Sequence, residues 1–173
     1  GTDAVMLSAE SAVGQYPDRA VAVMADVCIG AEAYKLPSNS ARRRASDHFG
    51  YVDQAIAMSV MYAANHMDVH AIIALTESGS TSLWMSRIRS DIPVYAFSRQ
   101  PQTLRRVALY RGVYPVLFDA PDAAGDELYH QLFNRLLELD KAEEGDLVVF
   151  TKGDMRGVAG GTNAMTLLRV TSQ

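Results

Sequence analysis

Short apolar runs alternate with helix-like stretches over most of this chain. Runs rich in β-branched and aromatic residues predict strands at 71–75, 94–97, 113–118, 147–150 and 165–170. Helices are expected between them, over 52–64 and from starts near Thr81, Pro101 and Ala123. Strand–helix–strand units favour parallel pairing with right-handed crossovers and helices on both faces. The pattern therefore predicts an α/β fold, a three-layer α/β/α domain with a mostly parallel sheet of about five strands. Pro115 makes the third strand an edge strand or places a bulge in it.

The first residues show a separate strand and helix. Ala4–Leu7 is an apolar run typical of a strand buried on both faces, and Tyr16-Pro17-Asp18 starts a helix with an apolar stripe. One strand and one helix cannot enclose a core. We therefore expect residues 1–33 to be the last βα unit of a larger α/β structure, and a chain that opens within a strand suggests a fragment.

A polar stretch follows this opening. Residues 34–47 lose the periodicity and contain Arg42, Arg43 and Arg44 in a row, which indicates a linker. Such a short basic run is most often solvated or lies at the edge of an interface. The expected organisation is residues 1–33 as the opening unit, 34–47 as the linker and 48–173 as the α/β domain.

Composition narrows the classes of function. With 49% hydrophobic and 21% charged residues among 173, the chain has the apolar content of a globular protein. A formal net charge of −4 without a basic stripe argues against nucleic-acid binding. No apolar run approaches the ~20 residues of a membrane span. One cysteine, Cys28, allows no internal disulfide, so a reducing, cytoplasmic setting is expected.

The turn after the first strand of the domain is rich in hydroxyl groups. Thr76, Ser78, Ser80 and Thr81 surround Gly79, directly before a predicted helix. This combination has the composition of a phosphate-binding loop. The hydroxyl groups and the N–H groups at the helix start can donate to phosphate oxygens, and the glycine lets the backbone approach them closely. The other interpretation is that these residues only cap the helix.

A second candidate loop, residues 156–163, is rich in glycine and lies between the last two strands. Loops at the carboxyl ends of strands line the ligand crevice of open α/β sheets, so it and the turn are expected to face one site. Arg156 offers a planar fork to phosphate. A plain hairpin connection is the alternative.

The four histidines lack zinc-ligand spacing, and neither a nucleophile elbow nor a P-loop sequence is present.

Several ordered motifs resemble one known family. GTDAVMLSAES at residues 1–11 and GQYP at 14–17 are similar to the final barrel repeat of the pyruvate kinases, a (β/α)8 (TIM) barrel. LTESG at 75–79, SRQPQT at 98–103, LYRGVYPV at 109–116 and GTN at 161–163 recur in that family in the same order. The resemblance covers essentially the whole chain and is of the bacterial type.

The resemblance implies a parent enzyme that transfers phosphoryl from phosphoenolpyruvate to ADP, giving pyruvate and ATP in glycolysis. It implies Mg²⁺ and K⁺ in that homotetrameric, allosteric parent, with none expected in this chain. The catalytic lysine and metal-binding carboxylates of the family lie upstream, so Ser8, Glu10 and Ser11 are peripheral at best and the chain alone should be inactive.

The family often holds a sugar-phosphate or nucleotide effector in its C-terminal domain. The residues matching that site are Thr76, Glu77, Ser78, Gly79, Ser80, Thr81, Arg156, Gly157, Gly160 and Gly161. Two departures matter, because the family often has Arg where Ser80 stands, and members activated by fructose bisphosphate often have a basic residue where Glu77 stands. We therefore expect a monophosphate rather than a bisphosphate, and either the Glu77 side chain points away from it or the site is unused. A free-standing sugar-phosphate-binding or assembly module without catalysis is the alternative function.

Overall fold

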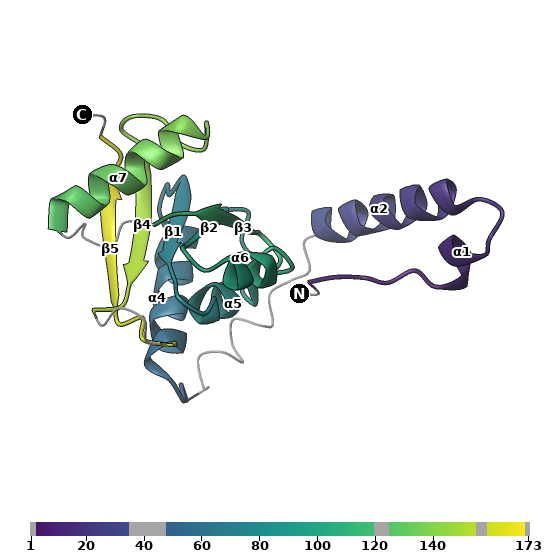
Figure 1. Cartoon of the computed structure of the whole chain (residues 1–173), viewed down its shortest axis with the longest axis horizontal. Coiled ribbons are helices and arrows are strands. Elements are labelled where there is room, and N and C mark those ends of the chain that lie inside the picture. Colours follow the sequence, from purple (N-terminus) through teal and green to yellow (C-terminus); the bar gives the residue numbers. More distant parts are fainter. Residues whose placement is uncertain (1–2, 35–47, 120–124, 155–158, 172–173) are drawn as a thin grey trace. The chain divides into compact units, whose positions relative to one another are not determined.

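The structure, a computed structural model, describes residues 3–34, 48–119, 125–154 and 159–171. The chain divides into two compact units, one of Ala4–His48 and one of Phe49–Gln173 together with Gly1–Asp3. Figure 1 labels the helices and strands of both units. Apart from Tyr34, the predicted linker with its three arginines lies outside the described residues, as do Arg156 and Gly157.

The smaller unit contains two helices, α1 (Ala9–Ala12) and α2 (Pro17–Ala33). Pro17 stands in the first turn of α2, as predicted, where its missing N–H costs nothing. The predicted strand at Ala4–Leu7 is wrong for this chain, because these residues belong to no strand and Met6 is 83% exposed. A strand needs neighbours for its N–H and C=O groups, and the described part of this unit contains no strand to supply them. Much of the predicted apolar stripe of α2 is likewise more than half exposed, including Val23 and Val27.

The larger unit is built on one five-stranded sheet with the order β3-β2-β1-β4-β5. The strands are β1 (Ala71–Leu75), β2 (Val94–Ser98), β3 (Val113–Leu117), β4 (Leu147–Lys152) and β5 (Ala164–Arg169). The four strands β3, β2, β1 and β4 run parallel, and β5 is antiparallel to β4. The predicted fold class is therefore confirmed. Strand β3 is an edge strand, as predicted from Pro115, which has no backbone N–H to donate to a second neighbour.

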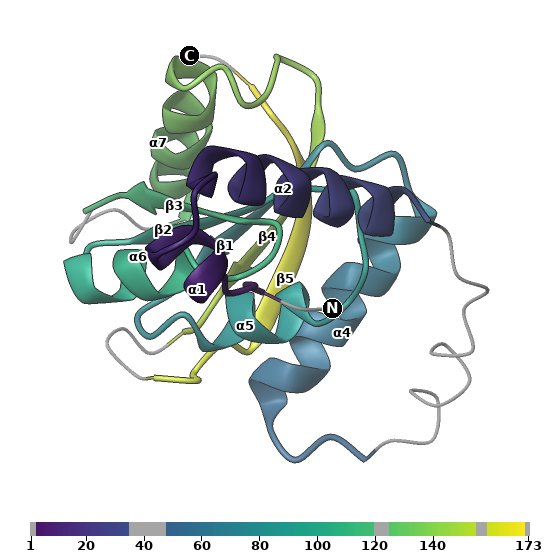
Figure 2. The ribbon, with the colours of Figure 1, turned by 90° about the vertical axis from the view of Figure 1, so that its right-hand side faces the viewer.

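Helices cover both faces of this sheet and complete three layers. Helix α7 (Gly125–Glu138) packs on one face, and α4 (Val52–His66), α5 (Ser80–Ser86) and α6 (Pro101–Val107) contribute to the core on the other. Figure 2 shows strands of the sheet passing between α7 and α4. In the described part of the chain, none of the helices has the length and apolar character that a membrane crossing requires.

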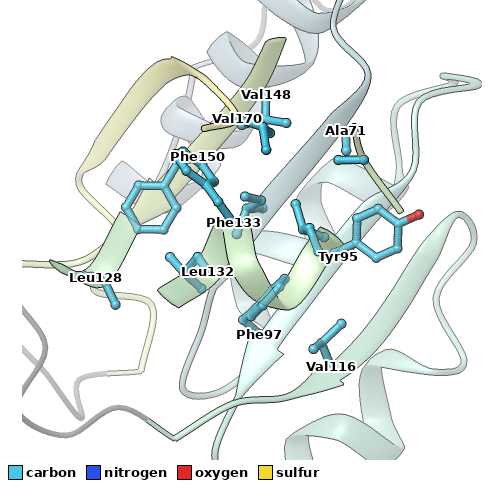
Figure 3. Close-up of a cluster of buried hydrophobic side chains, with 13 residues drawn as sticks. Ala71, Tyr95, Phe97, Val116, Leu128, Leu132, Phe133, Val148, Phe150 and Val170 are labelled. Atoms are coloured by element: carbon cyan, nitrogen blue, oxygen red, sulfur yellow. The ribbon is translucent and has the colours of Figure 1, made fainter. Parts of the chain in front are cut away.

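Alternation along the central strands divides the core into two clusters. In β1, Ala71 and Ile73 face α7, whereas Ile72 and Ala74 belong to the cluster with α4, and all four are fully buried. A strand covered on both faces needs such an unbroken apolar run. Leu128, Leu132 and Leu136 recur at helical spacing on α7 and belong to the buried cluster that includes aromatic residues of the sheet. Figure 3 labels Leu128 and Leu132 together with Phe97 and Phe150 of the strands. The sheet is thus held rigidly, with its strand ends available for loops.

Candidate functional site

Two loops begin at the same edge of the sheet. The turn 76–81 leaves the carboxyl end of β1, and segment 153–163 leaves the carboxyl end of β4. Because β1 and β4 are parallel neighbours, with Ala74 opposite Thr151, these ends lie side by side. β5 then returns antiparallel to β4, so the hairpin interpretation of the second segment is correct for its topology.

The turn is shaped by its glycine and by two hydroxyl groups that accept backbone bonds. Gly79 has φ +83°, a left-handed conformation that favours glycine. Its N–H donates to Thr76 Oγ1 at 2.9 Å, and the N–H of Ser80 donates to Ser78 Oγ at 3.4 Å. The N–H of Thr76 is itself bound to the carbonyl of Phe97 on β2 at 2.9 Å. Sheet and turn are therefore one hydrogen-bonded structure.

Ser80 and Thr81 use their hydroxyl protons inside the protein. Ser80 Oγ donates to Asp53 Oδ2 at 2.5 Å, and Thr81 Oγ1 donates to Thr162 Oγ1 at 2.6 Å. The second bond joins the turn to the hairpin that follows β4. The two predicted loops thus touch, and their contact is a buried pair of hydroxyls rather than an open pair of donors.

Asp53, in the first turn of α4, is a site residue that sequence reasoning missed. Its side chain is only 3% exposed, and a Cβ at Gly160 would lie 3.5 Å from its Oδ2 atom. Among the described residues, no lysine or arginine lies within salt-bridge distance of it. Two like charges at 4 Å repel by roughly 4 kcal/mol at an effective dielectric constant near 20. A phosphate that entered beside Ser80 would meet this repulsion.

Glu77 is bound to the residues that lead into α6. Gln100 Nε2 donates to Glu77 Oε1 at 2.8 Å, and Arg99 Nη2 lies 3.7 Å from the same oxygen. Both partners hold the carboxylate at the start of the helix. The negative charge of Glu77 is therefore partly compensated by Arg99. Its repulsion of an anion bound elsewhere on the turn is correspondingly weaker.

Helix α6 packs closely on the turn. A Cβ at Gly79 would lie 2.6 Å from Val107 Cγ1 and 3.6 Å from Thr103 Cγ2. Thr103 Oγ1 donates to the carbonyl of Glu77 at 2.6 Å, and Arg106 Nη1 donates to the carbonyl of Ser78 at 3.4 Å. The turn thus has two sides: α4 contributes a buried carboxylate, and α6 contributes a guanidinium.

Of the four predicted site residues in the second loop, the structure describes Gly160 and Gly161. Gly160 has φ +69° and approaches Asp53, and the carbonyl oxygen of Gly161 would lie 2.5 Å from a Cβ at Gly153. The two strands of the hairpin therefore come too close at this point for larger residues. Arg156 and Gly157 are outside the described part of the chain.

Ser8, Glu10 and Ser11 form a local helix start in the smaller unit. The N–H of Ser8 donates to Glu10 Oε2 at 3.0 Å, and Ser11 Oγ donates to the carbonyl of Ser8 at 3.5 Å. The backbone N–H of Glu10 and that of Ser8 lower the pKa of the Glu10 carboxyl group. These bonds are local to the first turn of α1, and the Ser8 side chain makes no capping hydrogen bond.

No group of three or more His, Cys, Asp or Glu side chains that could hold a metal ion occurs in the described ranges.

A pocket of about 760 Å³ lies at the opposite end of the parallel strands, where their amino ends are. Its walls include Met67, His70, Asp91, Gly145, Asp146 and Arg169. None of these residues was predicted as a site, and the pocket is a rival location for a ligand.

Comparison with known proteins identifies the family. The model of the family described as "Pyruvate kinase, alpha/beta domain" matches residues 54–168. Pyruvate kinase II of Salmonella typhimurium is 52% identical over 98% of this chain and 35% of its own length. The pyruvate kinase of Haemophilus influenzae is 49% identical over 88% of this chain and 32% of its own. That of Staphylococcus saprophyticus is 36% identical over 96% and 28%, respectively.

The matched relatives are much longer than this chain. It spans about 35% of the length of the Salmonella protein and of pyruvate kinases from Buchnera aphidicola. The family match covers most of the larger unit, including both loops at the carboxyl edge of the sheet. The chain therefore belongs to the pyruvate kinase family.

Proposed function

We propose that this chain is the C-terminal regulatory and oligomerisation part of a pyruvate kinase. Its parent protein would transfer phosphoryl from phosphoenolpyruvate to ADP and release pyruvate and ATP. The observation that carries this proposal is the 52% identity, over nearly the whole chain, to a protein named pyruvate kinase II. The Mg²⁺ and K⁺ sites and the catalytic groups are assigned to the remainder of the parent, so the 173-residue chain alone is expected to be inactive.

The test is an assay of the parent protein expressed from its complete reading frame. Pyruvate formation from phosphoenolpyruvate and ADP is expected with Mg²⁺, with stimulation by K⁺, and none is expected from the 173-residue chain. A well-folded parent that forms no pyruvate would overturn the kinase proposal and favour a free-standing ligand-binding module. Sedimentation of the parent should give a homotetramer, and its location should be cytoplasmic.

For the chain itself, we propose binding of a sugar phosphate or nucleotide effector at the turn 76–81 and at Gly160 and Gly161 of the hairpin. Arg156 and Gly157, which the sequence also assigns to this site, lie outside the described residues. The hydroxyls of Thr76 and Ser78 accept backbone bonds, and no acceptor for their own protons is recorded in the described part of the chain. Ser78 is partly exposed and can offer its proton to a phosphate oxygen, whereas Thr76 is buried. A monophosphate is favoured over a bisphosphate, because the carboxylates of Asp53 and Glu77 would repel a second phosphate group on the turn.

Calorimetric titration of the 173-residue chain tests this effector proposal. Ribose 5-phosphate, glucose 6-phosphate, AMP and fructose 1,6-bisphosphate are compared, with unphosphorylated ribose and glucose as controls. A monophosphate should bind most tightly and the two free sugars should not bind. The absence of binding by all four phosphorylated compounds, to a chain shown to be folded by circular dichroism, would refute the effector proposal.

A further inference from the structure

Arg106 of α6 is an exposed cation placed directly beside the turn. Its Nη1 atom lies 3.4 Å from the carbonyl oxygen of Ser78, which is long for an N–H···O bond. A guanidinium carries five N–H donors, so this single contact leaves most of its capacity unused. Among the described residues, no carboxylate forms an ion pair with Arg106.

The position of Arg106 is fixed by the residues around it. Thr103, one turn earlier on α6, donates its hydroxyl proton to the carbonyl of Glu77 at 2.6 Å. Val107, the next residue, is fully buried and would lie 2.6 Å from a Cβ at Gly79. Because α6 is attached to the turn on both sides of Arg106, the backbone of this residue is fixed beside the turn before any ligand arrives.

The charges around the turn differ between its two sides. On the α4 side, the buried Asp53 carboxylate accepts the Ser80 hydroxyl and has no cationic partner in the described part of the chain. On the α6 side, Arg99 and Gln100 hold the Glu77 carboxylate, and Arg106 remains uncompensated. An anion is therefore repelled at Ser80 and attracted at Ser78.

We propose that the effector phosphate binds on the α6 side of the turn, between the Arg106 guanidinium and the Ser78 hydroxyl. Arg106 is then the residue that selects phosphorylated ligands, and it supplies the positive charge that Ser80 does not carry. Its planar fork suits two phosphate oxygens. This inference rests on the proposed effector function and adds to it the side of the turn and the residue responsible.

The test compares three variants of the 173-residue chain, titrated with whichever of ribose 5-phosphate, glucose 6-phosphate, AMP and fructose 1,6-bisphosphate binds the unaltered chain most tightly. Arg106→Gln removes the charge and should weaken binding by about 10- to 100-fold, equivalent to about 1.4–2.8 kcal/mol. Arg106→Lys keeps the charge but not the fork and should recover part of that loss. Arg105→Gln removes an exposed charge from the adjacent position of α6, for which no contact with the turn is recorded, and should change the affinity less than twofold.

The outcomes separate the two proposals. If the unaltered chain binds none of the four phosphorylated compounds, the effector function itself fails. If it binds one of them and Arg106→Gln binds it equally well, the effector function stands and the assignment of Arg106 is overturned. Equal losses in Arg105→Gln and Arg106→Gln would also overturn it, because they would indicate a general charge effect. Circular dichroism and thermal unfolding should be the same for all variants, since both side chains are exposed.

Discussion

Replacing Gly79 by alanine tests how tightly α6 holds the turn. The residue has φ +83°, and an added Cβ would lie 2.6 Å from Cγ1 of the fully buried Val107. Gly112 is a matched control, because it has φ +69° but nothing within 4 Å of an added Cβ. Both substitutions impose the left-handed conformation on alanine, whereas only the first also creates a steric overlap.

The expected magnitudes follow from these two terms. The left-handed conformation costs a non-glycine residue roughly 1–2 kcal/mol, and overpacking of a well-packed site costs about 1–3 kcal/mol. Gly79→Ala should therefore lower the free energy of unfolding by about 2–5 kcal/mol, and Gly112→Ala by only about 1–2 kcal/mol. In the background of Val107→Ala the overlap is removed, so Gly79→Ala should then cost about as much as Gly112→Ala.

Urea unfolding followed by the fluorescence of Trp84 measures these differences. Trp84 is the single tryptophan, and it lies on α5 immediately after the turn and packs against the buried cluster. Equal losses for the two glycine variants would refute the close packing of α6 on the turn. So would a loss for Gly79→Ala that Val107→Ala leaves unchanged, because the overlap would then lie elsewhere.

Three further predictions test separate parts of the account. Thr81→Val should cost about 1–3 kcal/mol in urea unfolding, because it leaves the buried Thr162 hydroxyl without its donor. Adding Thr162→Val should recover most of that loss, and a fully additive double variant would contradict the pairing. Leu132→Ala should cost about 2–5 kcal/mol in the same assay, since the side chain is fully buried between α7 and the sheet; a loss below ~1 kcal/mol would contradict that burial. Asp53→Asn should raise the affinity for ribose 5-phosphate about fivefold by calorimetry, by removing like-charge repulsion of roughly 1 kcal/mol; a lower affinity would instead show that the carboxylate contacts the ligand.

Local patterns along the sequence were sufficient to predict most elements of the larger unit. The unbroken apolar run of 71–75 is β1, and Pro115 lies on an edge strand because it has no N–H for an inner one. The starts of α5, α6 and α7 fall within two residues of those predicted at Thr81, Pro101 and Ala123. These features depend on short-range propensity and burial, which a single sequence carries.

The sequence placed the turn and the hairpin at one site, but most side-chain contacts between distant parts of the chain were not predicted from it. Asp53 is an ordinary acid in the first turn of a helix until folding places it 2.5 Å from Ser80 Oγ. Arg106 is one of two adjacent arginines, and only the packing of α6 puts it beside Ser78. The strand predicted at Ala4–Leu7 was wrong for a related reason, since pairing requires neighbours that the described residues of that unit do not supply.

Location of the bound ligand tests the central claim most directly. Amide proton–nitrogen correlation spectra of the isotopically labelled chain, recorded during titration with ribose 5-phosphate, report on each loop separately. The account predicts the largest shifts at Ser78, Gly79 and Gly160, at the carboxyl edge of the sheet. Gly145, which lines the pocket at the opposite edge, should not shift. Shifts confined to Gly145 and its neighbours, with Gly79 unchanged, would contradict the proposed site.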